Sequence, residues 1–149
     1  MATGRGKSSG FTLVELMVVL AIIGVSATAV VLMLPGEDAA ARKDAERFAS
    51  RLIAARDHAL FSGRQTSAYV DARGYRFEES VGGEWMLLND PPLKVDIWDA
   101  GVTATSDAPF PVRIRFDSVG VADGSDLTLS SGGEIVMVTL DSGGQPRLR

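Results

Sequence analysis

Apolar and polar positions are distributed very unevenly along the chain. Residues 11–34 form an almost unbroken apolar run, FTLVELMVVLAIIGVSATAVVLML, which holds a single charged residue, Glu15. As a helix this run would be about 36 Å long, against roughly 30 Å for the hydrocarbon core of a bilayer. The pattern therefore predicts a transmembrane helix over residues 11–34.

Residues 1–10 precede this run and contain Arg5 and Lys7 but no acid. Basic residues beside an apolar segment hold that end of the segment in the cytoplasm. Three interpretations follow: a secretory signal cleaved near the small residues 27–29, a plain single-pass anchor, or an anchor processed at the Gly10–Phe11 junction. The apolar run continues beyond residues 27–29 and contains a carboxylate, which argues against the secretory signal.

Glu15 is the one residue of this run whose presence has to be explained, because it is charged. A carboxylate inside a membrane helix costs roughly 2.5–3.5 kcal/mol on insertion scales, so such a residue is expected to be functional and to have a partner. The alternative is a glutamate close enough to the lipid headgroups to stay hydrated. We predict that Glu15 has a role in assembly.

A second helix is predicted over residues 35–63. Pro35-Gly36 interrupts the first helical pattern, because proline removes a backbone donor and clashes with the preceding turn. The pattern resumes at Asp38, a suitable N-cap, and Gly63 is a suitable C-terminal stop. Apolar residues recur at three- and four-residue steps: Ala41, Ala45, Phe48, Ala49, Leu52, Ala55 and Ala59. This stripe predicts an amphipathic helix that packs on a sheet.

The polar residues of this helix are interpreted as surface groups. Arg42, Lys43, Arg47 and Arg51 lie off the apolar stripe among acidic residues, so a solvated face is expected. His58 is the only histidine and has no second ligand or nucleophile nearby in the sequence. We therefore expect His58 to be a helix-surface residue and not a catalyst.

After Gly63 the period changes from helical to alternating, which indicates β-strands. Strands are expected at residues 66–71, 75–79, 85–88, 93–98, 102–105, 112–117, 127–129, 134–140 and 146–149. Gly74 is expected to supply a positive φ in the first turn, and Leu93, Val95 and Ile97 to share one face. Short strands between glycine turns predict an antiparallel β domain over residues 64–149, as one twisted or two packed sheets. The predicted fold class is α+β, with a long N-terminal helix packed on this domain.

Candidate chemistry is sparse. The chain has no cysteine, which excludes disulfides, thiolate nucleophiles and cysteine metal ligands. No glycine pair falls in a phosphate-binding pattern and no serine has an activating neighbour, so neither enzymatic activity nor a cofactor is predicted. Asp117, Asp123 and Asp126 are conceivable calcium ligands, but their spacing matches no EF-hand loop. Three aromatic residues are expected in the core: Tyr75, Phe77 and Trp85.

The charge of the chain narrows the class of partner. The net charge is −4, and residues 35–149 hold 13 basic and 18 acidic residues, a net charge near −5. The chain therefore has no overall positive charge that would attract nucleic acid, and a nucleic-acid partner is not expected.

The junction Gly10-Phe11-Thr12-Leu13-Val14-Glu15 resembles the class III signal of type IV pilins and type II secretion pseudopilins. The resemblance implies that a prepilin peptidase cuts between Gly10 and Phe11 on the cytoplasmic side and then methylates the amino terminus of Phe11. It also implies a partner for Glu15, the positive amino terminus of Phe11 on a neighbouring subunit. Residues 1–10 would then be a leader peptide.

Three further segments are similar to the H-type minor pseudopilins of type II secretion and the T-type minor pilins: AARDHALFSGR, YVDARGYRFE and EWMLL. The later segment RIRFDSVGVADG also fits, although members usually carry proline where Ser118 stands. The resemblance implies a minor subunit near the tip of a periplasmic pseudopilus, anchored once in the bacterial inner membrane with its C-terminal domain in the periplasm. Its implied partners are the major shaft subunit, the minor tip subunits, the prepilin peptidase, the inner-membrane assembly platform and the lipid bilayer.

The alternative function is that of a type IV minor pilin that binds DNA during uptake. Its sequence support is Arg147 and Arg149 at the end of the chain. These two arginines are equally typical of edge strands, where charge blocks unwanted strand pairing.

Overall fold

The computed structural model describes residues 12–33 and 38–149, which belong to two compact units, Met1–Pro35 and Gly36–Arg149. The predicted processing junction, Gly10–Phe11, and the predicted break, Pro35-Gly36, lie outside the described residues. Each unit is built by a different pattern of apolar side chains, and each is described by itself.

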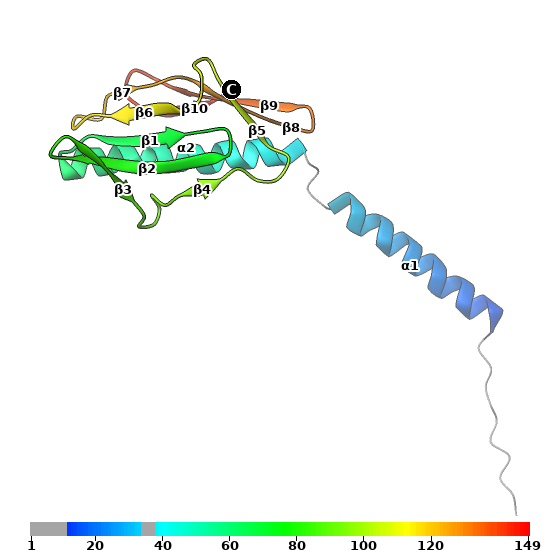
Figure 1. Ribbon diagram of the computed structural model, residues 1–149. Helices are drawn as coiled ribbons and strands as arrows, with labels where there is room; N and C mark the ends of the chain where they lie inside the picture. Colours follow the sequence, from blue (N-terminus) through cyan, green and yellow to red (C-terminus); the bar gives the residue numbers. More distant parts are fainter. Residues whose placement is uncertain (1–11, 34–37) are drawn as a thin grey trace, which may run out of the picture. The chain divides into compact units, whose positions relative to one another are not determined.

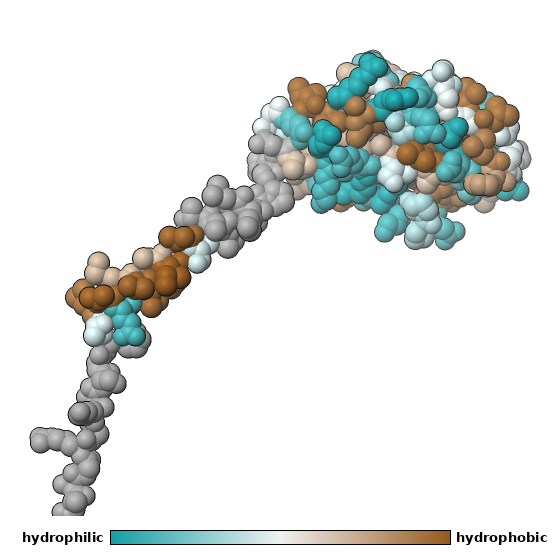
Figure 2. Space-filling model, turned by 180° about the vertical axis from the view of Figure 1, so that it is seen from behind, coloured by the Kyte–Doolittle hydropathy of each residue, from teal (hydrophilic) through white to brown (hydrophobic). Residues whose placement is uncertain are grey.

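The first unit contains helix α1, Leu13–Met33. Its first turn is capped by Thr12, whose hydroxyl accepts a hydrogen bond from the Glu15 amide at 3.3 Å. From residue 12 to residue 27 every side chain is exposed, and Figure 2 shows this helix as apolar except near its start. By length and apolarity, no helix in the described residues qualifies as a membrane span. The span over residues 11–34 therefore stays a prediction.

The second unit is built around helix α2, Asp38–Ser62. The predicted apolar stripe is confirmed, because Ala41, Ala45, Phe48, Leu52, Ala55 and Ala59 are all fully buried. The predicted stop is confirmed as well. Gly63 adopts φ 68° and donates its amide hydrogen to the Ala59 carbonyl at 3.0 Å.

Ten strands follow α2 and form two antiparallel sheets. A six-stranded sheet has the order β3-β2-β1-β6-β7, with β4 pairing with β2, and a four-stranded sheet has the order β10-β9-β8-β5. The strands are β1 Thr66–Val70, β2 Gly74–Val81, β3 Glu84–Leu88, β4 Asp96–Ile97, β5 Thr103–Ser106, β6 Val112–Phe116, β7 Ala122–Asp123, β8 Leu127–Ser131, β9 Glu134–Leu140 and β10 Pro146–Leu148. The sequence left open whether the domain has one twisted sheet or two sheets, and the structure has two.

Helix α2 contacts strands of both sheets, as Figure 1 shows. The core therefore lies between the helix stripe and the inward side chains of the strands, such as Phe77, Phe116, Leu127 and Leu129. The predicted α+β class, a helix packed on an antiparallel β domain, is confirmed. Tyr75 and Phe77 are core residues as expected, whereas Trp85 is only half-buried on the edge strand β3.

The prediction of a strand over residues 93–98 is wrong except for Asp96 and Ile97, which pair with β2. Leu93 and Trp98 are buried, while Val95 and Ile97 are exposed, so the expected common face does not exist. The indole of Trp98 packs on Phe48 and donates a hydrogen bond to the Asp71 carbonyl at 3.3 Å. Burial of this large side chain overrides the local alternation.

The reason given for Gly74 is also wrong, because Gly74 is not among the glycines with positive φ. The turn is held instead by Asp71, whose Oδ1 accepts hydrogen bonds from the amides of Arg73 at 2.7 Å and Gly74 at 3.1 Å. A Cβ at residue 74 would lie 2.2 Å from the Asp96 carbonyl oxygen. Glycine is needed here so that β4 can approach β2.

Candidate functional site

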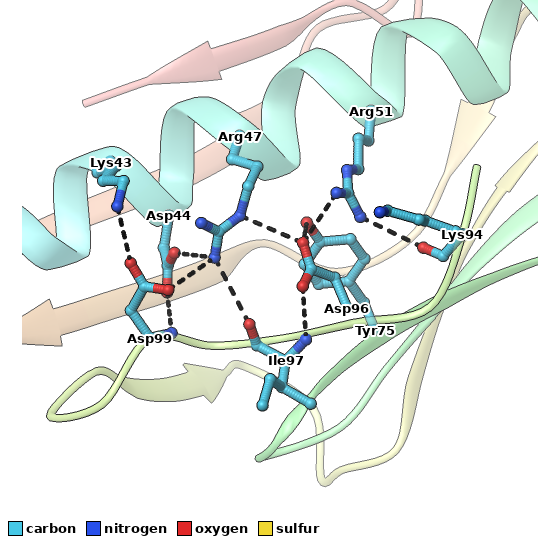
Figure 3. Close-up of polar contacts among 9 residues, drawn as sticks. All are labelled: Lys43, Asp44, Arg47, Arg51, Tyr75, Lys94, Asp96, Ile97 and Asp99. Carbon is cyan, nitrogen blue, oxygen red and sulfur yellow. Dashed lines mark hydrogen bonds and ion pairs between the residues drawn. The ribbon is translucent and has the colours of Figure 1, made fainter. Parts of the chain in front are cut away.

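A partly buried ionic cluster joins the N-terminal half of α2 to residues 94–99 (Figure 3). Asp44 is fully buried, which is rare for a carboxylate unless it is paired. Its Oδ2 accepts a hydrogen bond from the Asp99 amide at 2.7 Å, and its Oδ1 pairs with the Arg47 guanidinium. The carboxylate thus fixes both a neighbouring turn of its own helix and a loop more than 50 residues away.

Three basic residues of α2 complete this cluster. Arg47 lies 3.3 Å from both Asp96 and Asp99, Arg51 lies 2.9 Å from Asp96, and Lys43 lies 3.3 Å from Asp99. The expected solvated basic face is therefore wrong for Arg47 and Arg51, which are mostly covered. The expectation holds for Arg42, which pairs with Glu46, and for Lys43, because both basic side chains are mostly exposed.

The cluster shifts the acidity of its members in opposite directions. Burial raises the pKa of Asp44, although the Asp99 amide and Arg47 act against that rise. The hydrogen bond from Lys43, together with Arg47, holds the pKa of Asp99 below its usual value. Burial raises the pKa of Tyr75, whose ring lies beside Arg51, to about 12. These charged groups bond to one another, so the cluster holds residues 94–99 against α2.

A second ionic contact joins the other end of α2 to β2. Glu79 is buried, and its two carboxylate oxygens contact His58 at 2.9 Å and Arg64 at 3.1 Å. His58 is a partly exposed residue on the surface of α2, as expected, but its contact with Glu79 was not expected. Burial alone would raise the pKa of Glu79, but the hydrogen bonds from His58 and Arg64 outweigh it and lower that pKa.

This contact predicts a dependence of stability on acid. Because folding lowers the pKa of Glu79 below 4.5, its stabilising contribution is present above that pH and is lost as the pH falls through the lowered value. Urea unfolding between pH 6 and pH 3 should therefore show a smaller acid-induced loss of stability in Glu79→Gln than in the wild type. Glu84→Gln, at an exposed position, is the matched control and should follow the wild type. Parallel curves for wild type and Glu79→Gln would refute this role.

The outer face of the six-stranded sheet carries a ladder of arginines and aromatic rings. Tyr69 lies between Arg76, at 3.8 Å from the ring centroid, and Arg113, at 5.4 Å. Arg113 also lies 4.5 Å from the ring centroid of Trp85. Glu78 pairs with Arg76 at 2.8 Å and with Arg113 at 2.6 Å. Trp85, expected in the core, is thus held on the surface by a cation–π contact.

The end of the chain bears on the DNA-binding alternative. Strand β10 is an edge strand, and Arg147 contacts Asp141 at 3.1 Å. Arg149 continues the pairing with Met137 through backbone hydrogen bonds of 2.8 and 3.0 Å. One of the two arginines is therefore already neutralised, which favours the edge-strand interpretation.

The conceivable calcium ligands do not converge. Asp117 uses Oδ1 to accept hydrogen bonds from the amides of Val119 and Val121, at 3.0 and 2.8 Å, within its own turn. Across residues 12–33 and 38–149, no group of three or more His, Asp or Glu side chains is arranged to hold a metal ion.

Two family models match the chain. The prokaryotic N-terminal methylation motif matches residues 5–31, which include Gly10, Phe11 and Glu15, and the type II transport protein GspH model matches residues 44–145. The methylation motif covers most of the apolar helix α1, and α2 packs on two antiparallel sheets. These two features define a protein of the pilin and pseudopilin class. Within this class, the chain belongs to the type II transport protein GspH family.

A known relative agrees with this assignment. The chain is 35% identical over 119 residues to type II secretion system protein H of Aeromonas hydrophila, which covers 76% of this chain and 65% of that relative. The chain therefore spans about two thirds of the length of the curated relative. The methylation motif and the family fit a periplasmic pseudopilin anchored in the inner membrane.

Solved structures share the fold. The minor pseudopilin EpsH of Vibrio cholerae is similar with a TM-score of 0.63 and 22% identity, over 74% of this chain and 96% of that chain. The type IV minor pilin FimU of Pseudomonas aeruginosa is similar with a TM-score of 0.58 and 17% identity, over 73% and 87%. Both similarities show that the chain has the pilin-like fold.

Proposed function

We propose that the protein is a minor subunit of the type II secretion pseudopilus, placed near its tip, where it joins the tip subunits to the shaft. The main support is the combination of the methylation motif with the GspH family match. The proposed partners are the major shaft subunit, the other minor subunits, the prepilin peptidase and the inner-membrane assembly platform. The role is structural, so the energy for export comes from other proteins of the system.

The proposed topology follows from the first helix. Residues 11–34 would cross the inner membrane once, with the N-terminus in the cytoplasm and residues 36–149 in the periplasm. The exposed apolar side chains of α1 support this placement, because a helix that is apolar all round needs an apolar surrounding. The peptidase would cut between Gly10 and Phe11 and methylate Phe11.

Glu15 is the proposed assembly residue. It occupies the first turn of α1, one turn after the Thr12 cap, and is the sole charged residue of the apolar run. In the bilayer its carboxylate would pair with the amino terminus of Phe11 on a neighbouring subunit. Such a pair satisfies two charges that the hydrocarbon would otherwise leave unsolvated, and so it would set the axial register of the subunit.

The test is Glu15→Leu in cells that express the whole secretion system. The variant should still be inserted in the membrane and processed, because leucine favours insertion. Its co-purification with other pseudopilins should fall at least tenfold, and export should fall with it. Glu15→Asp keeps the charge and is the matched control, which should retain part of the assembly.

Two results would contradict the proposal. Normal co-assembly of Glu15→Leu would remove the assembly role of Glu15. A native protein that mass spectrometry finds to begin at Met1 or Val30, and not at a methylated Phe11, would remove the pseudopilin interpretation of the N-terminus.

A further inference from the structure

A hollow of about 360 Å³ opens between the C-terminal half of α2 and the loop that follows β3. One wall is formed by Ala54, His58 and Phe61, which follow one another at helical spacing on α2. The opposite wall is formed by Leu88 and Pro91-Pro92. Most of this lining is apolar, so the hollow fits an apolar side chain.

Phe61 is the unusual residue of this hollow, because 91% of its surface is exposed. It lies outside the buried stripe of α2, so the fold does not explain its presence there. Aromatic side chains, including phenylalanine, are enriched at protein interfaces relative to the rest of the surface. Covering this side chain would remove apolar surface from water and so favour binding, which suits Phe61 as an anchor for a partner.

The rim of the hollow is acidic. Asp57 is half-exposed, and its nearest basic group is Arg56 at 3.9 Å, too far for a strong pair. In the described part of the chain, no basic side chain pairs with the carboxylate of Asp90. His58 is already bonded to Glu79 at 2.9 Å and does not compensate this rim. A partner with a basic group on either side of an apolar one would complement both charge and shape.

We propose that this hollow is a docking site for a segment of a neighbouring pilin-type subunit that presents one apolar side chain flanked by lysine or arginine. The proposal rests on the proposed function for the identity of the neighbour. A second copy of this chain fits less well, because a two-fold contact would bring Asp57 and Asp90 of both copies together. The surface would thereby select one neighbour among subunits with similar helices.

The test is photo-crosslinking in cells that express the whole secretion system. The photoreactive residue p-benzoyl-phenylalanine replaces Phe61, and a matched control carries it at Ile135, a 68% exposed residue on β9. Only position 61 should give a product with another pilin-type subunit, at a peptide with lysine or arginine within three residues of the crosslink. Replacing both rim acids, Asp57→Lys with Asp90→Lys, should reduce the product at least fivefold. In the double lysine variant, replacing the partner's lysine or arginine by aspartate should restore the crosslinked product.

Several outcomes would overturn the docking site. A product with lipid or with a second copy of this chain, or a product that the charge reversal leaves unchanged, contradicts it. Co-purification with other pilin-type subunits is measured in the same cells, and far-UV circular dichroism checks that each variant is folded. A chain that co-purifies but gives no product at position 61 overturns the docking site alone. A chain that does not co-purify overturns the proposed function with it.

Discussion

Asp44→Ala is expected to lower the free energy of unfolding by about 3 kcal/mol, because it breaks a partly buried ionic cluster. The Asp99 amide would lose the acceptor that lies 2.7 Å away. Arg47 would keep Asp96 and Asp99 but lose its fully buried partner. Urea unfolding of the full chain in detergent measures the effect, and tryptophan fluorescence reports the β domain because both tryptophans, at residues 85 and 98, lie in it.

Asp44→Asn is the matched control. Its amide oxygen can still accept from the Asp99 amide, so we expect a loss of about 1 kcal/mol. Burial raises the pKa of Asp44, which means that its ionisation opposes folding, and asparagine avoids that cost. If Asp44→Ala and Asp44→Asn unfold at the same urea concentration, the hydrogen bond to the loop is not what the carboxylate contributes.

Phe48→Ala is expected to lower the free energy of unfolding by about 3–5 kcal/mol, the range for deleting a fully buried aromatic side chain. The ring is fully buried, with centroids 4.7 Å from Tyr75 and 5.6 Å from Trp98. Its removal leaves a cavity at the point where α2, β2 and the segment before β5 meet. Thermal and urea unfolding followed by circular dichroism measure the loss.

Two controls calibrate this result. Phe48→Leu keeps much of the apolar volume and should lose clearly less than the alanine variant. Phe61→Ala removes the same side chain from an exposed site on the same helix and should change stability by less than about 0.5 kcal/mol. A loss in Phe48→Ala no larger than in Phe61→Ala would mean that the aromatic cluster does not hold the domain together.

The helix and most strands of the β domain were predictable because their signals are local. The stripe from Ala41 to Ala59 follows one helical period, and Gly63 stands where a left-handed residue ends the helix. The alternation in Val112–Phe116 and Glu134–Leu140 defines strands in the same way. In each case, residues close together in the sequence show which face is buried, and the element that covers this face need not be known.

The segment from Leu93 to Trp98 was mispredicted because its conformation depends on distant residues. Trp98 is drawn inward by Phe48, and Asp96 is held by Arg47 and Arg51, about 45 residues earlier in the chain. Lys43, Arg47 and Arg51 do recur every fourth residue, which puts one row of positive charge along α2. That row was the available signal for an ionic partner, but nothing in it indicates which acids would pair with it.

The candidate sites divide in the same way. Gly10, Phe11 and Glu15 follow from a contiguous motif, and they remain predictions. The hollow beside Phe61 joins a helix to a loop across about 30 residues, so no local pattern indicates it. Sequence reasoning also missed the contact of His58 with Glu79, because β2 has to fold back along the helix before the two side chains meet.

The ionic cluster has a mechanical consequence. A force applied through the residues before α2 acts first on Asp38, the first residue of the helix. Helix ends are ordinarily the parts that fray first. Lys43, Asp44 and Arg47 tie the next turns to the loop at residue 99, so that fraying is stopped within a few residues of the point of entry. If such a force reaches the first turn of α2, residues 38–149 would therefore move together, and α2 would not unwind from that end.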